Sequence, residues 1–391
     1  MVSKVLMLNQ ISVKGLERLP REQYEIASEF SSPDAILLRS HKLKMEDISD
    51  SVLAIGRAGA GTNNIPVEAC SKRGIPVFNS PGANANAVKE LVAAGLLLGS
   101  RGIVEGISYV NTLGDMSDEA ELNKLLEAQK KQFKGGELVG KTLGVVGLGA
   151  IGSLVAEMAL TFGMEVVGYD PALSVEAAWR LSSKVQKADA LAALFARCDF
   201  ISLHLPVLDS TRGLINAELL RGVKPGTCLL NFARQEIVDN HAVCESLDNG
   251  GLRAYIADFP APELIGRNDV ILMPHIGAST DEAEENCAIM AADQLRDFLE
   301  NGNVRNSVNF PPLQLDRVSG IRLSITNENV PRILGSVLAL LADDNINVID
   351  MLNKSRDEVA YNLIDVASEP SETSLAKMRE LDGVINVRLI A

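Results

Sequence analysis

The stretch from Thr142 to Pro171, TLGVVGLGAIGSLVAEMALTFGMEVVGYDP, limits the possible folds more than any other part of the sequence. An apolar run meets glycines at 147, 149 and 152, a helix-like segment follows, and a second apolar run ends at Asp170. Glycines that follow a strand and open a helix, with an acid at the end of the next strand, are the fingerprint of a dinucleotide-binding βαβ unit. The segment therefore predicts a doubly wound α/β domain.

Each part of this motif has a physical role. Gly147 permits the tight turn, Gly149 lets backbone N–H groups approach a pyrophosphate at the positive end of the helix dipole, and Gly152 allows close packing of helix and strand. Asp170 accepts hydrogen bonds from the adenosine ribose and repels the additional phosphate of NADP, which predicts NAD as the cofactor. The alternative is that the glycines serve packing alone.

Composition excludes several classes of partner. The 391-residue chain carries a formal charge of −14, which argues against nucleic acid and anionic membranes, because phosphate-backbone affinity comes from many Lys and Arg. The cysteines are widely spaced and include no C-x-x-C pair, as expected of reduced thiols in a cytoplasmic protein without a metal site. The longest apolar stretch, 91–99, is about half of what a bilayer requires, so we expect a buried helix.

The chain divides into three parts by pattern. Residues 1–98 alternate strand-like and helix-like runs, and a second βα series begins near Lys141, so both predict Rossmann-like doubly wound sheets. The amphipathic segment 282–300 is expected to return to the first domain, and a linker rich in Pro and Asn follows it. Residues 319–391 read as βαββαβ, a ferredoxin-like module. We therefore expect a substrate domain (1–98 with 283–318), a cofactor domain (99–282) and a C-terminal domain (319–391).

Polar residues at strand ends are the candidates for catalysis. Hydride transfer needs a proton carrier and a cationic anchor for the substrate. His275 in MPHIGAST, Arg234 in NFARQEIVD and Asp258 in IADFPAPE each follow an apolar run, with Glu263 in the loop beyond Asp258. Taken singly, each also fits an ordinary surface or core role, so this pattern leaves both interpretations open.

Taken together, these motifs closely resemble the D-2-hydroxyacid dehydrogenase family. The N-terminal segments ILLRSHK, GRAGAGTNNI and FNSPGANANAVKELV are similar to substrate-domain signatures of its D-3-phosphoglycerate dehydrogenase branch, and the C-terminal module resembles an ACT domain. The resemblance covers essentially the whole chain. It implies that His275 is the general acid/base, that Glu263 orients its imidazole, and that Arg234 binds the substrate carboxylate and carbonyl oxygen.

The resemblance also implies the binding residues. For the cofactor these are Ser80, Gly147, Gly149, Ala150, Ile151, Gly152, Asp170, Leu205, Phe232, Ala233, Asp258, Gly277 and Ala278. For a phosphorylated hydroxyacid they are Arg39, Ser40, Arg57 and Asn84. One departure is Gln235, which stands where the family usually has glycine after the catalytic arginine.

The C-terminal module leaves two interpretations open. Some bacterial relatives bind serine through a His-x-Asn pair and a later Asn, and the matching residues here are Asn327, Asn329 and Asn347, so the His is replaced. The module is therefore either a serine site or only an assembly unit, and the resemblance implies a homodimer or homotetramer. The leading functional hypothesis is NAD-dependent oxidation of 3-phosphoglycerate. The alternatives are a glyoxylate or hydroxypyruvate reductase and, in another class, an NAD-sensing corepressor or scaffold.

Overall fold

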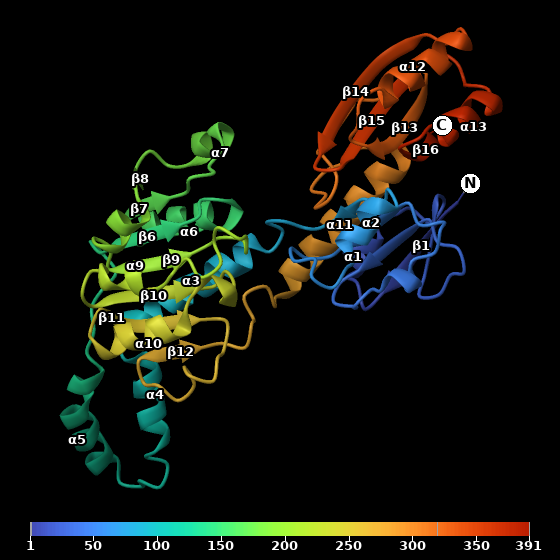
Figure 1. Ribbon diagram of the computed structural model, residues 1–391. Helices are drawn as coiled ribbons and strands as arrows, with labels where there is room; N and C mark the ends of the chain where they lie inside the picture. The colour runs from blue at the N-terminus through green and yellow to red at the C-terminus, as the bar shows by residue number, and fades with distance from the viewer. Residues whose placement is uncertain (1, 319, 391) are drawn as a thin grey trace. The chain divides into compact units, whose positions relative to one another are not determined.

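The computed structural model describes residues 2–318 and 320–390, and the chain forms two compact units (Figure 1). The first unit contains the residues up to Asn84 together with those from Asp281 onward, and the second unit is Ala85–Thr280. The contacts thus group the C-terminal segment with the N-terminal sheet. The three-domain boundaries expected from the sequence stay a prediction.

The first unit contains a parallel sheet in the order β2-β1-β3-β4-β5. Its strands are β1 (Ser3–Leu8), β2 (Tyr24–Ala27), β3 (Ala35–Leu38), β4 (Ala54–Arg57) and β5 (Val77–Phe78). The short elements α1 (Val13–Leu16), η1 (Met45–Asp47) and α2 (Val67–Lys72) connect them. All four residues of β3 are buried, as expected when both faces of a parallel sheet are covered.

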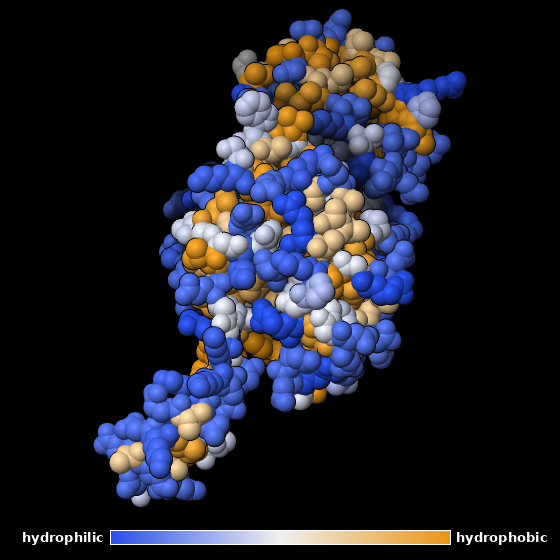
Figure 2. Space-filling view, turned by 90° about the vertical axis from the view of Figure 1, so that its left-hand side faces the viewer, coloured by the Kyte–Doolittle hydropathy of each residue, from blue (hydrophilic) through white to orange (hydrophobic). Residues whose placement is uncertain are grey.

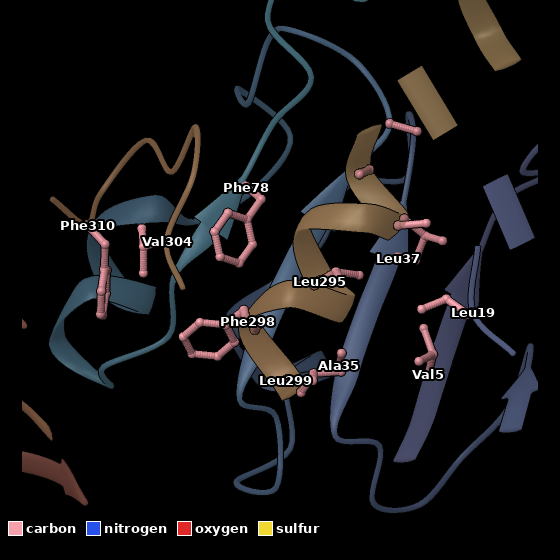
Figure 3. Close-up of a cluster of buried hydrophobic side chains, with 14 of the residues drawn as sticks. Val5, Leu19, Ala35, Leu37, Phe78, Leu295, Phe298, Leu299, Val304 and Phe310 are labelled. Atoms are coloured by element: carbon pink, nitrogen blue, oxygen red, sulfur yellow. The ribbon is translucent and has the colours of Figure 1, made fainter. Parts of the chain in front are cut away.

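The long helix α11 (Asp281–Asn301) covers one face of this sheet. Its apolar residues Leu295 and Phe298 belong to one buried cluster with Leu37 of β3 and Phe78 of β5 (Figure 3). The sequence pattern placed an amphipathic helix at 282–300, and the helix occupies that position. Helix α11 thus runs from the carboxyl edge of the sheet toward the C-terminal segment.

The C-terminal segment forms an antiparallel sheet in the order β14-β15-β13-β16. The elements follow one another as β13 (Ile321–Glu328), α12 (Ile333–Asp343), β14 (Val348–Arg356), β15 (Val359–Val366), α13 (Glu372–Glu380) and β16 (Val384–Ile390). This is the βαββαβ order that the sequence predicts. The two helices pack with one face of the sheet in a cluster of their own, built around Leu323, Val337 and Met378.

The other face of the C-terminal sheet encloses the end of α11. The main-chain carbonyl oxygens at positions 299, 301 and 302 accept hydrogen bonds from Arg388 (2.7 Å), Arg322 (3.0 Å) and Tyr361 (2.7 Å) respectively. Arg322 is fully buried and also forms a bidentate pair with Asp365, at 2.6 and 2.8 Å. The last carbonyls of a helix lack partners within the helix, so these side chains supply them. We call this set of contacts the helix clasp.

The second unit contains a longer parallel sheet in the order β12-β11-β10-β9-β6-β7-β8. Its strands are β6 (Thr142–Val146), β7 (Glu165–Tyr169), β8 (Gln186–Lys187), β9 (Phe200–Leu203), β10 (Thr227–Asn231), β11 (Leu252–Ala257) and β12 (Val270–Leu272). The strand order reverses between β6 and β9, which is where doubly wound sheets bind their ligands. The α/β fold with Rossmann-like sheets expected from the sequence is confirmed.

Helices cover this sheet, and one segment extends from it. The covering elements are α3 (Ala85–Ser100), α6 (Ala150–Thr161), α8 (Leu191–Phe195), α9 (Ala217–Arg221), η3 (Gln235–Ile237) and α10 (Asn240–Asp248). Helix α7 (Val175–Arg180) lies between β7 and β8 in the chain, and its Val175 and Trp179 are 76% and 84% exposed. Three further elements, α4 (Ile103–Asn111), α5 (Glu119–Gln129) and η2 (Lys130–Phe133), contain no buried residue within the described chain. We call residues 103–133 the arm.

The hydropathy of the helices bears on membrane insertion. Within residues 2–318 and 320–390, no single helix is long and apolar enough to cross a membrane. The bent pair of α3 and α4 meets the criterion by length and composition only. Helix α3, which contains the longest apolar stretch of the sequence, buries residues such as Val92 and Leu96 in the core of the second unit.

Candidate active site

The glycine-rich turn after β6 has the geometry that its sequence predicts. Gly147 has a φ of 90°, and a side chain there would lie 2.4 Å from the carbonyl oxygen of His204. A Cβ on Gly152 would lie 1.8 Å from the carbonyl oxygen of Gly147. Both positions therefore exclude any side chain, and the turn can reverse tightly between strand and helix.

The same turn leaves space for a phosphate group. A Cβ on Gly149 would meet no atom within 4 Å, so the backbone N–H groups that open α6 are approachable. Asp170 lies just past β7, and its carboxylate accepts the Leu148 N–H at 2.8 Å and the Ala172 N–H at 2.9 Å. Open backbone donors beside an acid at the next strand end fit the pyrophosphate and adenosine ribose of NAD.

Arg234 follows β10 at the same carboxyl edge of the sheet. Its side chain is half-buried, and Nη1 donates to the carbonyl of Ala233 at 2.7 Å. The fully buried Asn231 fixes this turn, because its amide donates to the Arg234 carbonyl at 3.0 Å and accepts the Ala233 N–H at 3.1 Å. Sequence reasoning missed this supporting role, although a polar residue inside the apolar run LLNFA was a usable signal.

Asp258 and His275 follow the next two strands of the sheet. Asp258 is 2% exposed, and its two oxygens accept the N–H groups of Ile276 at 2.8 Å and Gly277 at 2.6 Å. His275 has a φ of 58°, a left-handed conformation that costs a non-glycine residue about 1–2 kcal/mol. The buried carboxylate of Asp258 therefore holds the strained turn that presents His275.

The imidazole of His275 is exposed and has one aromatic neighbour. Its ring packs edge-on against Phe259, with ring centroids 4.9 Å apart and an interplanar angle of 66°. Phe259 follows Asp258 directly, so one short segment supports both the backbone and the ring of His275. Phe259 was not among the residues singled out from the sequence, and only its place beside Asp258 would have indicated it.

Glu263 has a different partner from the one that the resemblance implies. Its carboxylate accepts hydrogen bonds from its own main-chain N–H and from Asn240, and His241 lies nearby. These contacts lower the pKa of Glu263. Within the described residues, no hydrogen bond or ion pair joins Glu263 to His275. A Glu263–His275 pair therefore stays a prediction for the substrate complex, because catalytic hydrogen bonds are often long without substrate.

The other predicted cofactor residues of this unit surround the glycine turn and the ends of β9 and β10. Phe232, Ala233 and Gly277 are buried, Leu205, Ile151 and Ala278 are half-buried, and Ala150 is exposed. His204, beneath the turn, pairs its Nε2 with Ser202 Oγ at 2.9 Å, while its buried Nδ1 has no partner among the described residues. Burial lowers the pKa of His204 to about 3, so this imidazole is neutral.

The predicted substrate residues of the first unit gather at the carboxyl edge of its own sheet. Arg39 follows β3, and its Nη2 pairs with Glu284 of α11 at 2.5 Å. Arg57 ends β4, and its Nε donates to the Arg39 carbonyl at 3.1 Å. Ser80, the predicted cofactor residue of this unit, is fully buried, with its hydroxyl donating to the carbonyl of Cys287 at 2.8 Å. Ser40 is exposed and Asn84 is half-buried.

The predicted effector residues lie on the C-terminal sheet. Asn327 is 5% exposed, and its amide accepts from Asn362 at 2.8 Å and donates to the carbonyl of Glu328 at 2.6 Å. Asn329 and Asn347 are exposed. The polar atoms of Asn327 are thus already engaged within the sheet.

Comparison with known proteins identifies the relationship. Residues 107–277 match the D-isomer specific 2-hydroxyacid dehydrogenase NAD binding domain. The chain is 33% identical to D-3-phosphoglycerate dehydrogenase of Haemophilus influenzae over 359 residues, covering 89% of this chain and 83% of that protein. It is 30% identical to D-3-phosphoglycerate dehydrogenase of Escherichia coli K12 over 417 residues, covering 99% of this chain and 97% of that protein.

A solved structure of cofactor (NAD+) bound 3-phosphoglycerate dehydrogenase from Entamoeba histolytica superimposes with a TM-score of 0.61 at 28% identity. The match covers 79% of this chain and 99% of that one. The glycine turn, the acid after β7 and the matched domain define an NAD-binding oxidoreductase of the 2-hydroxyacid dehydrogenase class. Within that class, the chain belongs to the D-3-phosphoglycerate dehydrogenase family. The family and the cofactor expected from the sequence are confirmed.

Proposed function

We propose that this protein oxidises the C2 hydroxyl of 3-phospho-D-glycerate with NAD in the cytoplasm, giving 3-phosphohydroxypyruvate for serine biosynthesis. The observation that carries the proposal is the grouping of Asp170, Arg234 and Asp258 with His275 at the carboxyl ends of strands in one sheet. The names of the relatives support the choice of substrate.

Each residue of the site has its own role in the proposed reaction. Bound nicotinamide would supply the acceptor for the hydride that leaves C2. His275 takes the hydroxyl proton as the C2–H bond breaks, and Glu263 stabilises the imidazolium that results. Arg234 binds the carboxylate and the carbonyl oxygen through its planar fork, which a lysine lacks. Asp258 keeps the His275 turn in place throughout.

Arg39 and Arg57 are the proposed binding residues for the substrate phosphate, together with Ser40 and Asn84. The two arginines are linked at one sheet edge, where the Arg39 carbonyl accepts from Arg57 Nε and also from the amide of Asn64, both at 3.1 Å. Two guanidinium groups at one edge suit a phosphate dianion, because each can offer paired N–H donors.

The arm is the proposed contact with a second copy of this chain. Val104, Ile107 and Val110 of α4 are 36%, 59% and 52% exposed, and Figure 2 shows hydrophobic residues among hydrophilic ones on the visible face of the molecule. An apolar helix with no buried residue needs a partner to be stable. Sedimentation should show a dimer or tetramer, and Ile107→Glu should shift it toward monomer; an unchanged mass would contradict this assignment.

The C-terminal βαββαβ segment is proposed to be an ACT module. The engaged amide of Asn327 supports an assembly role for it over serine binding. Adding serine to the assay distinguishes the two, because inhibition at concentrations near its cellular level would establish the effector role.

The decisive assay follows NADH formation from 3-phosphoglycerate. His275→Ala should lower kcat by about 10²–10⁴-fold, the usual contribution of a general acid/base. Arg234→Lys should lower kcat/KM roughly 10- to 150-fold, since it loses one or more charged hydrogen bonds. Arg221→Lys, an exposed arginine on α9, is the matched control and should match the parent.

Two alternatives predict other outcomes. Faster turnover of glyoxylate or hydroxypyruvate than of 3-phosphoglycerate would identify a reductase of unphosphorylated substrates. Tight NADH binding with no turnover of any of these substrates would favour a cofactor-sensing scaffold. Either result would overturn the proposed function.

A further inference from the structure

An acidic side chain forms an ion pair with one of the two arginines proposed to bind the substrate phosphate. Glu284 lies in the first turn of α11, and its Oε1 pairs with Arg39 Nη2 at 2.5 Å. Both side chains are 40% exposed, so solvent and ligands can reach the pair. This ion pair joins residues 245 positions apart and crosses from the helix to the end of β3.

The surroundings hold the pair at the sheet edge. Cys287, one turn further along α11, is buried, and its pKa is raised first by burial, while the nearby Arg57 and Arg39 lower it and Glu284 raises it. Ser80 Oγ donates to the carbonyl of Cys287 at 2.8 Å, which ties this turn of the helix to the edge. Arg39, Arg57 and Glu284 are therefore close neighbours.

We propose that Glu284 sets the affinity of the phosphate site, because its carboxylate holds Arg39 until a phosphate dianion displaces it. The inference rests on the proposed function, in which Arg39 binds the substrate phosphate. A carboxylate carries one negative charge, whereas a phosphomonoester carries about 1.5 to 2 near pH 7. A doubly charged phosphate can therefore displace the Glu284 carboxylate from Arg39.

The size of the effect follows from the exposure of the pair. A half-exposed salt bridge favours the paired state by only about 1.4- to 5-fold. The free fraction of Arg39 is then about one half to one sixth, and binding to it is weakened by the same factor. Removing the competing carboxylate should strengthen phosphate binding by about two- to sixfold.

The test compares Glu284→Gln with Glu285→Gln. Glu285 is the next residue of the same helix and pairs with Lys14 at 2.6 Å, so its substitution removes a similar charge and a similar ion pair. The first measurement is calorimetric titration of the intact protein with inorganic phosphate at low ionic strength, where screening is weak. Glu284→Gln should bind phosphate about two- to sixfold more tightly than the parent, and Glu285→Gln should bind it as the parent does.

The second measurement is steady-state kinetics. Glu284→Gln should lower KM for 3-phosphoglycerate by a similar factor and leave KM for unphosphorylated hydroxypyruvate unchanged. Unchanged or weaker phosphate binding in Glu284→Gln, or equal changes in both variants, would overturn the inference. If Glu284→Gln binds phosphate more tightly but the parent protein does not oxidise 3-phosphoglycerate, Glu284 would still control the affinity of an anion site, and the proposed function would be overturned instead.

Discussion

Replacing Asp258 by asparagine should loosen the turn that carries His275. The parent carboxylate accepts two main-chain N–H groups, from Ile276 and Gly277, at 2.8 and 2.6 Å. Asparagine preserves the shape but offers one oxygen and one NH2 group, so one N–H loses its acceptor and faces another donor. Asp258 is 2% exposed, so water replaces the lost acceptor poorly.

The magnitude follows from these contacts. A hydrogen bond to a charged group contributes about 1.5–3 kcal/mol, and one such bond is lost. A domain of the size of the second unit changes its Tm by roughly 2–4 °C per kcal/mol, so Tm should fall by about 3–12 °C. Because the left-handed backbone of His275 is strained, the released turn should relax away from its working position. The same free energy lost from the transition state would lower kcat roughly 10- to 150-fold.

The assay pairs thermal unfolding with NADH formation, using Asp189→Asn as the control. Asp189 is an exposed acid of the same unit, 3.8 Å from Lys187, and its replacement should leave both quantities near the parent values. Asp258→Asn with the parental Tm and kcat would refute the reasoning, because the buried carboxylate would then contribute nothing to the turn.

Three further predictions concern other parts of the molecule. Asp170→Ala removes the acceptor of the Leu148 N–H and the expected ribose acceptor, so kcat/KM should fall with NAD and rise with NADP; an unchanged ratio of the two would contradict this. The pKa of His204 is about 3 in the folded state and about 6.5 when unfolded, so the unfolded chain binds more protons between these values. The free energy of unfolding should therefore fall by up to about 1.4 kcal/mol for each pH unit below about 6.5. Urea unfolding of His204→Gln should lack this contribution to the pH dependence. Arg322→Met leaves the buried carboxylate of Asp365 without its partner and should lower the free energy of unfolding by about 3–5 kcal/mol, as measured by chemical unfolding. Adding Asp365→Leu should restore most of this free energy.

Local sequence patterns were enough to predict the parts of the site that local backbone geometry determines. The turn at Gly147 and the acid at Asp170 lie within one βαβ unit, so spacing alone indicated their relationship. The alternation of strands and helices likewise predicted the two parallel sheets and the C-terminal βαββαβ order. His275 and Arg234 were singled out because functional side chains in such sheets follow the strand ends, and their roles were implied only by the family resemblance.

Long-range pairings escaped prediction for a physical reason. Glu284 meets Arg39 across 245 positions, and no local pattern distinguishes Glu284 from the neighbouring acids of α11. The bond between Glu263 and Asn240 depends on how the loop after β11 packs against α10, which composition does not encode. The roles of Asn231 and Phe259 arise from contacts that appear only once the strands are aligned.

The helix clasp has a consequence for anyone who shortens or recombines this protein. Cutting the chain before β13 would remove Arg322, Tyr361 and Arg388 together, leave three main-chain oxygens unpaired, and uncover the aromatic surface around Phe298. A truncated protein should therefore be prone to aggregation. In a fusion to another protein, the C-terminal segment would dock only if the recipient's helix ended within reach of the donors Arg322, Tyr361 and Arg388. The last turn of α11 should therefore be included in the transferred segment.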